Sequence, residues 1–280
     1  MEKENNNNEI SDLRRLQLTE LDMLKIFANI CDKYGLRYFL LGGTLLGAVR
    51  HGGFIPWDDD IDVCMPRNDY NRFLDVAEGE LSDPYYLDSM EKNSDYRYCF
   101  ARIANRNIKI MNYSANIPRE EDSWIDIIPM DGMPDGGMKL KLHKFRMVMW
   151  RGLNQVAQYD ELVDQKRRRG KFETLLVRVG GWKIWRPFVD YHKCMAHIKK
   201  ELVKYDYDSC DTVINFMAAY GFDETFRREW FGDACDLKFE DRYFKSPADH
   251  HHVLEKIYGD YMTMPPESER NKHNAEIIKI

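Results

Sequence analysis

The sequence predicts an α+β fold in which a mixed, strand-rich core is followed by a helical segment. Its 280 residues suit one large domain, or one domain with an appended lobe. Hydrophobic residues make up 44% of the chain and aromatic residues 13%, which is enough for a core and excludes global disorder or a fibrous protein. The expected order is a helix, a strand-rich stretch, a helical stretch and a mixed tail, which is typical of the α+β class.

Apolar residues at helical spacing predict the first helices. These helices span residues 11–34, residues 45–50 and a third segment that begins at Pro66 and carries Tyr70, Phe73, Leu74 and Ala77. Gly35 is placed to end the first helix, and proline is well tolerated in the first turn of the third. Three separate helices are therefore expected before the middle of the chain.

Short apolar runs bounded by turn-forming residues predict the strands. They lie at residues 37–41, 57–65, 85–90, 98–104, 108–112 and 123–129. Residues 51–56 and 130–137 are rich in glycine, proline and aspartate, so we expect them to form turns.

Changes in composition along the chain predict its organisation. Residues 1–10 read as a disordered polar leader, and residues 11–136 as the core. Helix-compatible patterns dominate residues 137–210, which we interpret as a helical insert or lobe. Residues 211–280 return to short mixed elements and are expected to pack back on the core.

Charge and cysteine usage narrow the possible partners and compartments. A formal net charge of −6 makes the chain a poor general nucleic-acid binder, so an anionic ligand must be held by a local site. The N-terminus lacks the features of a signal peptide, and no apolar run reaches the roughly 18 residues of a membrane span. The six cysteines are scattered, which is typical of reduced, mostly buried thiols. A cytoplasmic protein is expected.

The strongest chemical signal is the run of carboxylates at residues 58–62. On a strand, Asp58, Asp60 and Asp62 would share one face, and Asp59 would point away. Three carboxylates on one face repel one another unless a cation lies between them, and Mg²⁺ or Mn²⁺ prefers oxygen ligands. The alternative is a solvated acidic turn, although the apolar residues on both sides favour a packed position.

A glycine pair precedes this acidic run. Gly42, Gly43 and Thr44 lie between a predicted strand and a predicted helix, where backbone N–H groups can approach a phosphate closely. A tight turn without a ligand is the simpler explanation of such a pair. A phosphate cradle beside a cation site would suit phosphoryl or nucleotidyl transfer.

Two further aspartates lie in the last predicted strand and the turn after it. Asp126 interrupts an apolar run, and a buried carboxylate is costly unless it is paired or bound to a metal. It could complete the metal site, act as a base, cap a loop or hold an arginine. Asp131 precedes a glycine, and we predict a turn role for it.

The residues that carry these signals resemble the LicD family, which includes bacterial phosphocholine transferases and is related to fukutin and fukutin-related protein. The long run at residues 41–62 carries the resemblance, which continues at residues 125–132 and returns at 239–241, 258–262 and 265–266. It covers most of the chain, from about residue 17 to residue 273. The helical segment at 138–210 matches nothing that identifies an acceptor.

The resemblance implies a nucleotidyltransferase-like core with a mixed β-sheet flanked by helices. By position, Gly42 and Gly43 match the family's glycine element, and Asp126 matches its later strand carboxylate. Its acidic cluster is matched by Asp58, Asp60 and Asp62.

The implied activity is a metal-dependent transfer of a phosphocholine-like group. The donor would be CDP-linked, and the acceptor a hydroxyl of a cell-surface glycan or a lipid-linked precursor, as in lipopolysaccharide or teichoic acid. Transfer of a nucleoside monophosphate and a non-catalytic nucleotide-binding role remain alternatives.

Several other residues are candidates for contacts with substrates or membranes. Those expected near the donor are Arg50, His51, Arg102, Glu240 and Asp241, with Arg106 as a second basic residue. The alternatives are an exposed helix end for Arg50 and His51, and a role in shaping the tail for Glu240 and Asp241. The basic run at 166–169 precedes a Trp-rich apolar stretch that ends at Phe188, a pattern that suits peripheral contact at the inner face of the plasma membrane. Ordinary packing is the alternative for residues 166–188. The three histidines at 250–252 read as exposed.

Overall fold

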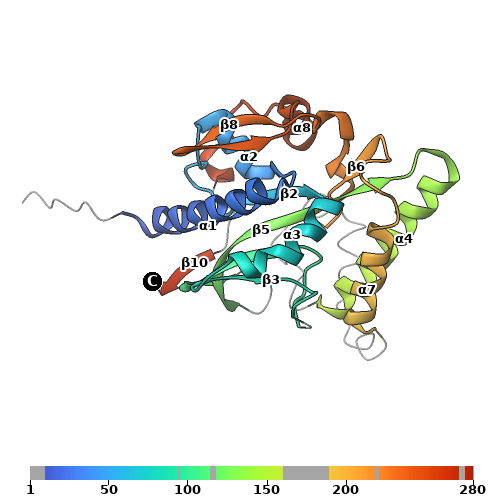
Figure 1. The fold of residues 1–280 in the computed structure, drawn as a ribbon, viewed down its shortest axis with the longest axis horizontal. Coiled ribbons are helices and arrows are strands. Elements are labelled where there is room, and N and C mark those ends of the chain that lie inside the picture. Colours follow the sequence, from blue (N-terminus) through green and yellow to red (C-terminus); the bar gives the residue numbers. More distant parts are fainter. Residues whose placement is uncertain are drawn as a thin grey trace, which may run out of the picture.

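The computed structural model describes residues 10–93, 95–113, 118–159, 189–217, 221–270 and 275–279. Its fold is shown in Figure 1. The leader and the segment 166–188, for which the sequence predicted disorder and a membrane contact, lie outside these residues apart from Ile10.

Helices and strands alternate irregularly along the chain. The helices are α1 (Asp12–Tyr34), α2 (Gly42–His51), α3 (Arg67–Glu80), α4 (Gly137–Ala157), α7 (Tyr191–Leu202) and α8 (His250–Tyr258). The 3-10 turns are η2 (Gly221–Glu224), η3 (Arg228–Trp230) and η4 (Glu267–Glu269). The strands are β1 (Phe39–Leu40), β2 (Asp62–Pro66), β3 (Tyr85–Asp88), β4 (Ala101–Asn112), β5 (Arg119–Met133), β6 (Thr212–Ile214), β7 (Thr225–Arg227), β8 (Cys235–Phe239), β9 (Arg242–Ser246) and β10 (Ala275–Lys279).

The main sheet is mixed, which confirms the predicted α+β class. Its strands run in the order β1-β2-β5-β4-β10, with β3 also on β4 and with β6 and β7 continuing from β5. The pair β2–β5 is parallel and the other pairs are antiparallel. Helices α1 and α3 cover the sheet, and the rings of Phe27 and Phe73 meet edge to face at 5.1 Å in the core between them. This arrangement is consistent with a nucleotidyltransferase-like core (Figure 1).

Helix α1 forms where the sequence predicted it, because both of its ends are capped. The hydroxyl of Ser11 accepts a hydrogen bond from the backbone N–H of Arg14 at 3.2 Å. Gly35 ends the helix in the left-handed conformation, with φ of 61°, which costs glycine little. The face of α1 that carries Leu16, Leu24 and Phe27 is buried against the sheet.

The strand predicted at 57–65 is shorter than expected, because its neighbours offer pairing only from Ile61 onward. The N–H of Asp126 on β5 donates to the carbonyl of Ile61, and the register then runs from Asp62 opposite Asp126. No strand in the described part of the chain pairs with residues 57–60, which form a loop. The two strands predicted at 98–104 and 108–112 are one strand, β4, which begins only at Ala101 and has a register shift between Asn105 and Lys109.

Strand β5 runs past the predicted end at residue 129, because its last residues gain new partners. Residues Asp131–Met133 pair with β6, so this stretch is strand and not the turn that the sequence predicted. Helix α4 then begins at Gly137 and packs on α7 around a second core that includes Met147, Met195 and Ile198. The β8–β9 hairpin and α8 lie against α2, and β10 pairs with β4.

The cysteines and the helices bear on two expectations drawn from composition. All six cysteines are free thiols, and five of them are buried, as expected for a reduced protein. Within the described ranges, no helix combines the length and the hydropathy that crossing a membrane requires.

Candidate active site

A row of charged side chains crosses four strands of the sheet on one face. Asp62 on β2 is opposite Asp126 on β5, Asp126 is opposite Arg102 on β4, and Arg102 is opposite Asp88 on β3. Residues in register on neighbouring strands point to the same face. The face opposite the α1 and α3 core therefore carries a line of carboxylates with one arginine among them.

Arg102 fixes the position of Asp126. Its Nε donates a hydrogen bond to Oδ1 of Asp126 at 2.7 Å. The guanidinium lies 4.2 Å from the ring centroid of Tyr98 and 4.1 Å from that of Trp124, so cation–π contacts with two rings help to hold it. Of the open roles for Asp126, holding an arginine is the one that the structure displays directly.

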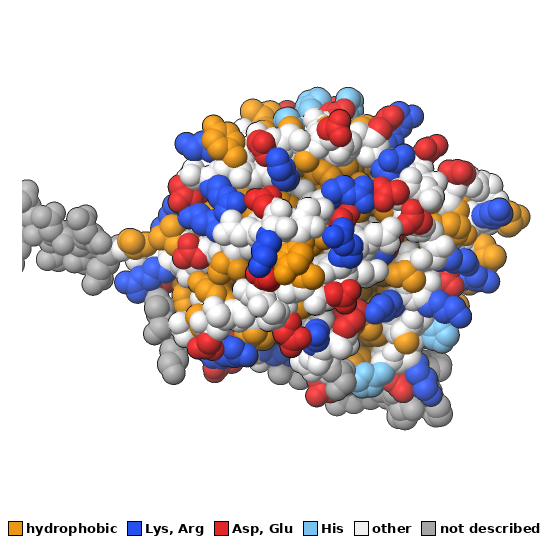
Figure 2. Space-filling model, in the orientation of Figure 1, with side chains coloured by type: hydrophobic (Ala, Val, Ile, Leu, Met, Phe, Trp, Pro, Cys, Tyr) orange, Lys and Arg blue, Asp and Glu red, His pale blue; other side chains and the backbone are white. Residues whose placement is uncertain are grey.

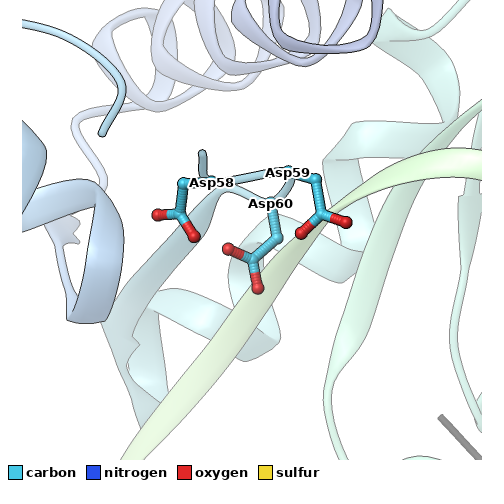
Figure 3. A group of neighbouring side chains, drawn as sticks. All are labelled: Asp58, Asp59 and Asp60. Atoms are coloured by element: carbon cyan, nitrogen blue, oxygen red, sulfur yellow. The ribbon is translucent and has the colours of Figure 1, made fainter. Parts of the chain in front are cut away.

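The loop before β2 brings three aspartates together. Oxygen atoms from Asp58, Asp59 and Asp60 lie within 4.8 Å of one another, and the three side chains extend to the same side of the loop (Figure 3). The expectation that Asp59 points away is wrong, because residues 58–60 form a loop and do not alternate as a strand would. Gln17 on α1 supports this loop by donating its Nε2 hydrogen to the carbonyl of Asp58 at 2.9 Å.

The glycine pair begins α2 and lies directly against two of these carboxylates. A Cβ on Gly43 would lie 2.5 Å from Oδ2 of Asp58, and one on Gly42 would lie 3.0 Å from Oδ2 of Asp62. Gly42 also has φ of 57°, in the left-handed region. Thr44 accepts a hydrogen bond from the backbone N–H of Asp62 at 2.9 Å. The first turn of α2 and the carboxylates thus form one continuous site.

Burial and mutual repulsion disfavour the ionised form of these groups. Burial raises the pKa of Asp62 well above its ordinary value, and the carboxylates of Asp60 and Asp126 raise it further. Burial also raises the pKa of Asp126, although the Arg102 guanidinium opposes this effect. A divalent cation would reverse this preference, because it stabilises the ionised carboxylates.

Glu20 is a carboxyl near this site that the sequence analysis missed. It lies on the buried face of α1 and is 2% exposed. Among the described residues its Oε2 has no hydrogen-bond partner. Burial raises the pKa of Glu20 well above its ordinary value, and the carboxylate of Asp60 adds to the effect. Its position four residues after Leu16 and four before Leu24, on the apolar face of a predicted helix, was a signal that could have identified it.

Four residues that were expected near the donor have contacts that join elements of the fold. They are Arg50, His51, Glu240 and Asp241. Arg50 donates to the carbonyl of Tyr261 at 2.9 Å, and the exposed His51 meets the ring of Trp57. Glu240 is paired with Arg14 at 2.6 Å and accepts from the backbone N–H of Phe54. Asp241 pairs with Lys25 of α1 at the surface. Their proposed contacts with a donor stay predictions.

The structure also bears on three further sequence interpretations, which concern Asp131, the histidines at 250–252 and Arg106. The turn role predicted for Asp131 is wrong, because Asp131 is a buried strand residue bound by Arg67 through two hydrogen bonds of 2.6 and 2.7 Å. His251 and His252 are exposed, as predicted, and His250 is half-buried at the start of α8. Arg106 is at the surface and pairs with Asp83.

A pocket of about 320 Å³ opens beside the charged row. Its walls include Asp88 and Arg102 from the row together with Tyr98, Glu121 and Trp124. The shared residues Asp88 and Arg102 make the pocket continuous with the row, so open space lies next to Arg102.

A mixed sheet with a glycine-opened helix and a carboxylate cluster at its edge defines an α+β core of the nucleotidyltransferase type. The family model described as LicD/FKTN/FKRP, nucleotidyltransferase domain, matches residues 35–136. These residues include the glycine pair, the acidic loop and Asp126.

Similarity to characterised proteins extends beyond that domain. The chain is 30% identical to the lipopolysaccharide cholinephosphotransferase LicD of Haemophilus influenzae, over 94% of this chain and 96% of that protein. It is also 56% identical to human ribitol 5-phosphate transferase FKRP over 104 residues, which are 35% of this chain and 21% of FKRP. The chain therefore belongs to the LicD family and is an enzyme of the phosphotransferase class.

Proposed function

We propose that this phosphotransferase moves a substituted phosphate, such as phosphocholine, from a CDP-linked donor to a hydroxyl group of a cell-surface glycan or its lipid-linked precursor. The observation that carries the proposal is the junction of the glycine-opened end of α2 with the carboxylates of Asp58 and Asp62. A helix N-terminus attracts phosphate oxygens, and neighbouring carboxylates suit the cation that accompanies a pyrophosphate. The similarity to a lipopolysaccharide cholinephosphotransferase over nearly the whole chain supports the substrate class.

We propose that Asp58, Asp60 and Asp62 hold Mg²⁺ or Mn²⁺, with Asp59 close by. The oxygen cluster within 4.8 Å consists of Asp58, Asp59 and Asp60 and does not include Asp62. Asp62 is linked to it by charge, because the carboxylates of Asp60 and Asp58 add to the effect of burial in raising its pKa. Oxygen ligands suit these hard cations, and a cation would compensate the shared negative charge. When bound, the cation would offset the charge on the donor phosphates and on the CMP leaving group.

We propose that Asp126 accepts the proton of the acceptor hydroxyl. The hydroxyl oxygen would form a bond to the transferred phosphorus while the bond from that phosphorus to CMP breaks, and the proton would pass to Asp126. Arg102 keeps the carboxylate in one orientation through the 2.7 Å hydrogen bond. Because burial raises the pKa of Asp126, its affinity for a proton is closer to that needed near neutral pH.

A screen of donors tests the reaction class. Purified protein with Mg²⁺ is offered CDP-choline, CDP-ribitol, CDP-glycerol, CDP-ethanolamine and CTP with a lipopolysaccharide or teichoic acid acceptor, and products are identified by mass spectrometry. We expect CMP release together with an acceptor that carries the donor's substituted phosphate. Pyrophosphate release from CTP with an acceptor that carries CMP would instead establish nucleotidyl transfer, and binding without turnover would establish a non-catalytic role.

Asp60→Asn tests the cation site with the preferred donor. We expect turnover to fall by more than 100-fold and the heat of Mg²⁺ binding, measured by calorimetry on the free protein, to be lost. Asp236→Asn is the matched control, because Asp236 is an exposed aspartate on the β8–β9 hairpin. Full activity of the wild type in excess EDTA, or wild-type activity of Asp60→Asn, would contradict the metal proposal.

A further inference from the structure

Helix α4 carries large apolar side chains on its exposed face. Met138, Leu142, Phe145 and Met149 follow one another at intervals of four, three and four residues, so they form a single line along the helix. Their exposed fractions run from 37% at Met149 to 77% at Met138. We call these four residues the α4 stripe, and the exposed Val148 lies beside it.

The opposite face of α4 packs against the core, so the stripe is not the core-facing side of this helix. His143, Met147 and Asn154 are buried, and Met147 belongs to the core that α4 shares with α7. A soluble helix normally exposes polar residues on its outer face. Packing among the residues that the structure describes therefore does not explain why the outer face of α4 is apolar.

The charges of α4 all have one sign. Its 21 residues contain no aspartate or glutamate, in a chain whose net charge is −6. The basic residues of the helix are Lys139, Lys141, Lys144, Arg146 and Arg151. Lys139 and Lys141 are exposed and flank the stripe, and among the described residues neither has an ion pair. Figure 2 shows basic and apolar side chains together on the edge of the molecule where Figure 1 draws α4.

We propose that α4 docks the protein on the surface of an anionic lipid bilayer, with the stripe inserted among the lipid head groups and the flanking lysines on their phosphates. A basic amphipathic helix with aromatic and aliphatic residues on one face has the composition of an interfacial helix. At 1.5 Å per residue, the stripe from Met138 to Met149 is about 17 Å long, or about three turns of contact with a flat surface. The charge of the helix favours anionic lipid over a neutral apolar partner.

Vesicle sedimentation tests this docking surface without any donor or metal, so its result is independent of the proposed reaction. We expect wild-type protein to pellet with phosphatidylcholine vesicles that contain 30% phosphatidylglycerol and not with vesicles of phosphatidylcholine alone. Raising the salt from 0.05 to 0.5 M should weaken binding, because it screens the lysines. Lys139→Ser with Lys141→Ser should lower the partition coefficient by roughly fivefold for each charge removed.

The apolar contribution is tested by Leu142→Ser with Phe145→Ser, which should reduce binding to the anionic vesicles at least tenfold. The control is Lys238→Ser with Tyr243→Ser, which removes one exposed lysine and one exposed ring on the β8–β9 hairpin and should bind as the wild type does. Melting curves establish that each variant is folded. Absence of wild-type binding at low salt, or unchanged binding of the Leu142 and Phe145 variant, would overturn the proposal. The proposal would also be overturned if light scattering showed that the wild type is a dimer and that Leu142→Ser with Phe145→Ser is a monomer. The stripe would then be a subunit interface.

Discussion

Glu20 has surroundings unlike those of an ordinary carboxylate. It is buried on α1, one oxygen lacks a hydrogen-bond partner among the described residues, and Asp60 is the neighbouring carboxylate with the largest effect on its pKa. A buried carboxylate without a partner costs free energy of folding, and proteins retain such groups mainly where function needs them.

Replacing Glu20 by glutamine should make the metal-free protein more stable at neutral pH. Because burial raises the pKa of Glu20, the folded chain binds its proton more tightly than the unfolded chain does. The carboxyl therefore destabilises the fold progressively as the pH rises above its ordinary pKa of 4.5. The melting temperature of Glu20→Gln, relative to wild type, should rise between pH 5 and pH 8 in calorimetry with EDTA.

A second carboxylate on the same helix provides the control for this experiment. Asp22→Asn changes an exposed side chain of α1, which has 62% of its surface accessible, and should show no comparable gain. A difference between Glu20→Gln and wild type that stays constant with pH would show that burial does not perturb this carboxyl.

Gly43 leaves room for the Asp58 carboxylate because glycine has no side chain. A Cβ at this position would lie 2.5 Å from Oδ2 of Asp58, too close for the carboxylate to stay in place. Gly43→Ala should therefore lower turnover at least tenfold and raise the Mg²⁺ concentration needed for half-maximal activity. Gly79→Ala, at an exposed position of α3 with open space around it, should keep full activity. Unchanged Mg²⁺ dependence in Gly43→Ala would show that Asp58 is not a cation ligand.

At the scale of elements, the helices follow their local sequence more closely than the strands do. Ser11 and Gly35 cap α1 at the ends that the sequence predicted, because caps act on residues a few positions away. Strand β2 instead begins only where β1 and β5 can pair with it, and β5 extends to Met133 because β6 is there to pair. Strand limits depend on partners that are distant in sequence.

The pair formed by Arg67 and Asp131 joins α3 to β5 in the interior. Both side chains are buried, with exposed fractions of 8% and 3%. Arg67→Met alone should lower the free energy of unfolding by roughly 3–5 kcal/mol, because it leaves Asp131 buried without its partner. Urea denaturation measures this, and Arg67→Met with Asp131→Leu should recover much of the loss. Arg227→Ala, which opens an exposed pair with Glu229, serves as the control with little expected effect.

At the scale of the whole molecule, charge is separated between the site and a distant surface. The acidic loop, Asp62 and Asp126 concentrate negative charge at the sheet, whereas α4 carries only basic charged residues. The site itself is assembled from α1, α2, β2, β4 and β5. The turn between β8 and β9 is joined to α1 by the ion pair of Glu240 and Arg14. Long-range pairing therefore determines how the carboxylates face one another.

The sequence by itself determined the fold class, the capped first helix and the residue types of the site, because composition, periodicity and a long motif are local properties. It also indicated that Asp126 lies partly inside the fold, since a carboxylate interrupts an apolar run there, and its side chain is 19% exposed. Only the tertiary structure decided that Asp59 turns toward Asp58 and Asp60, that Arg102 holds Asp126 and that Glu20 lies beside the acidic loop. These relations depend on which strands pair and on how α1 lies across them, and the pairing of segments far apart in the chain is not encoded in any single stretch of it.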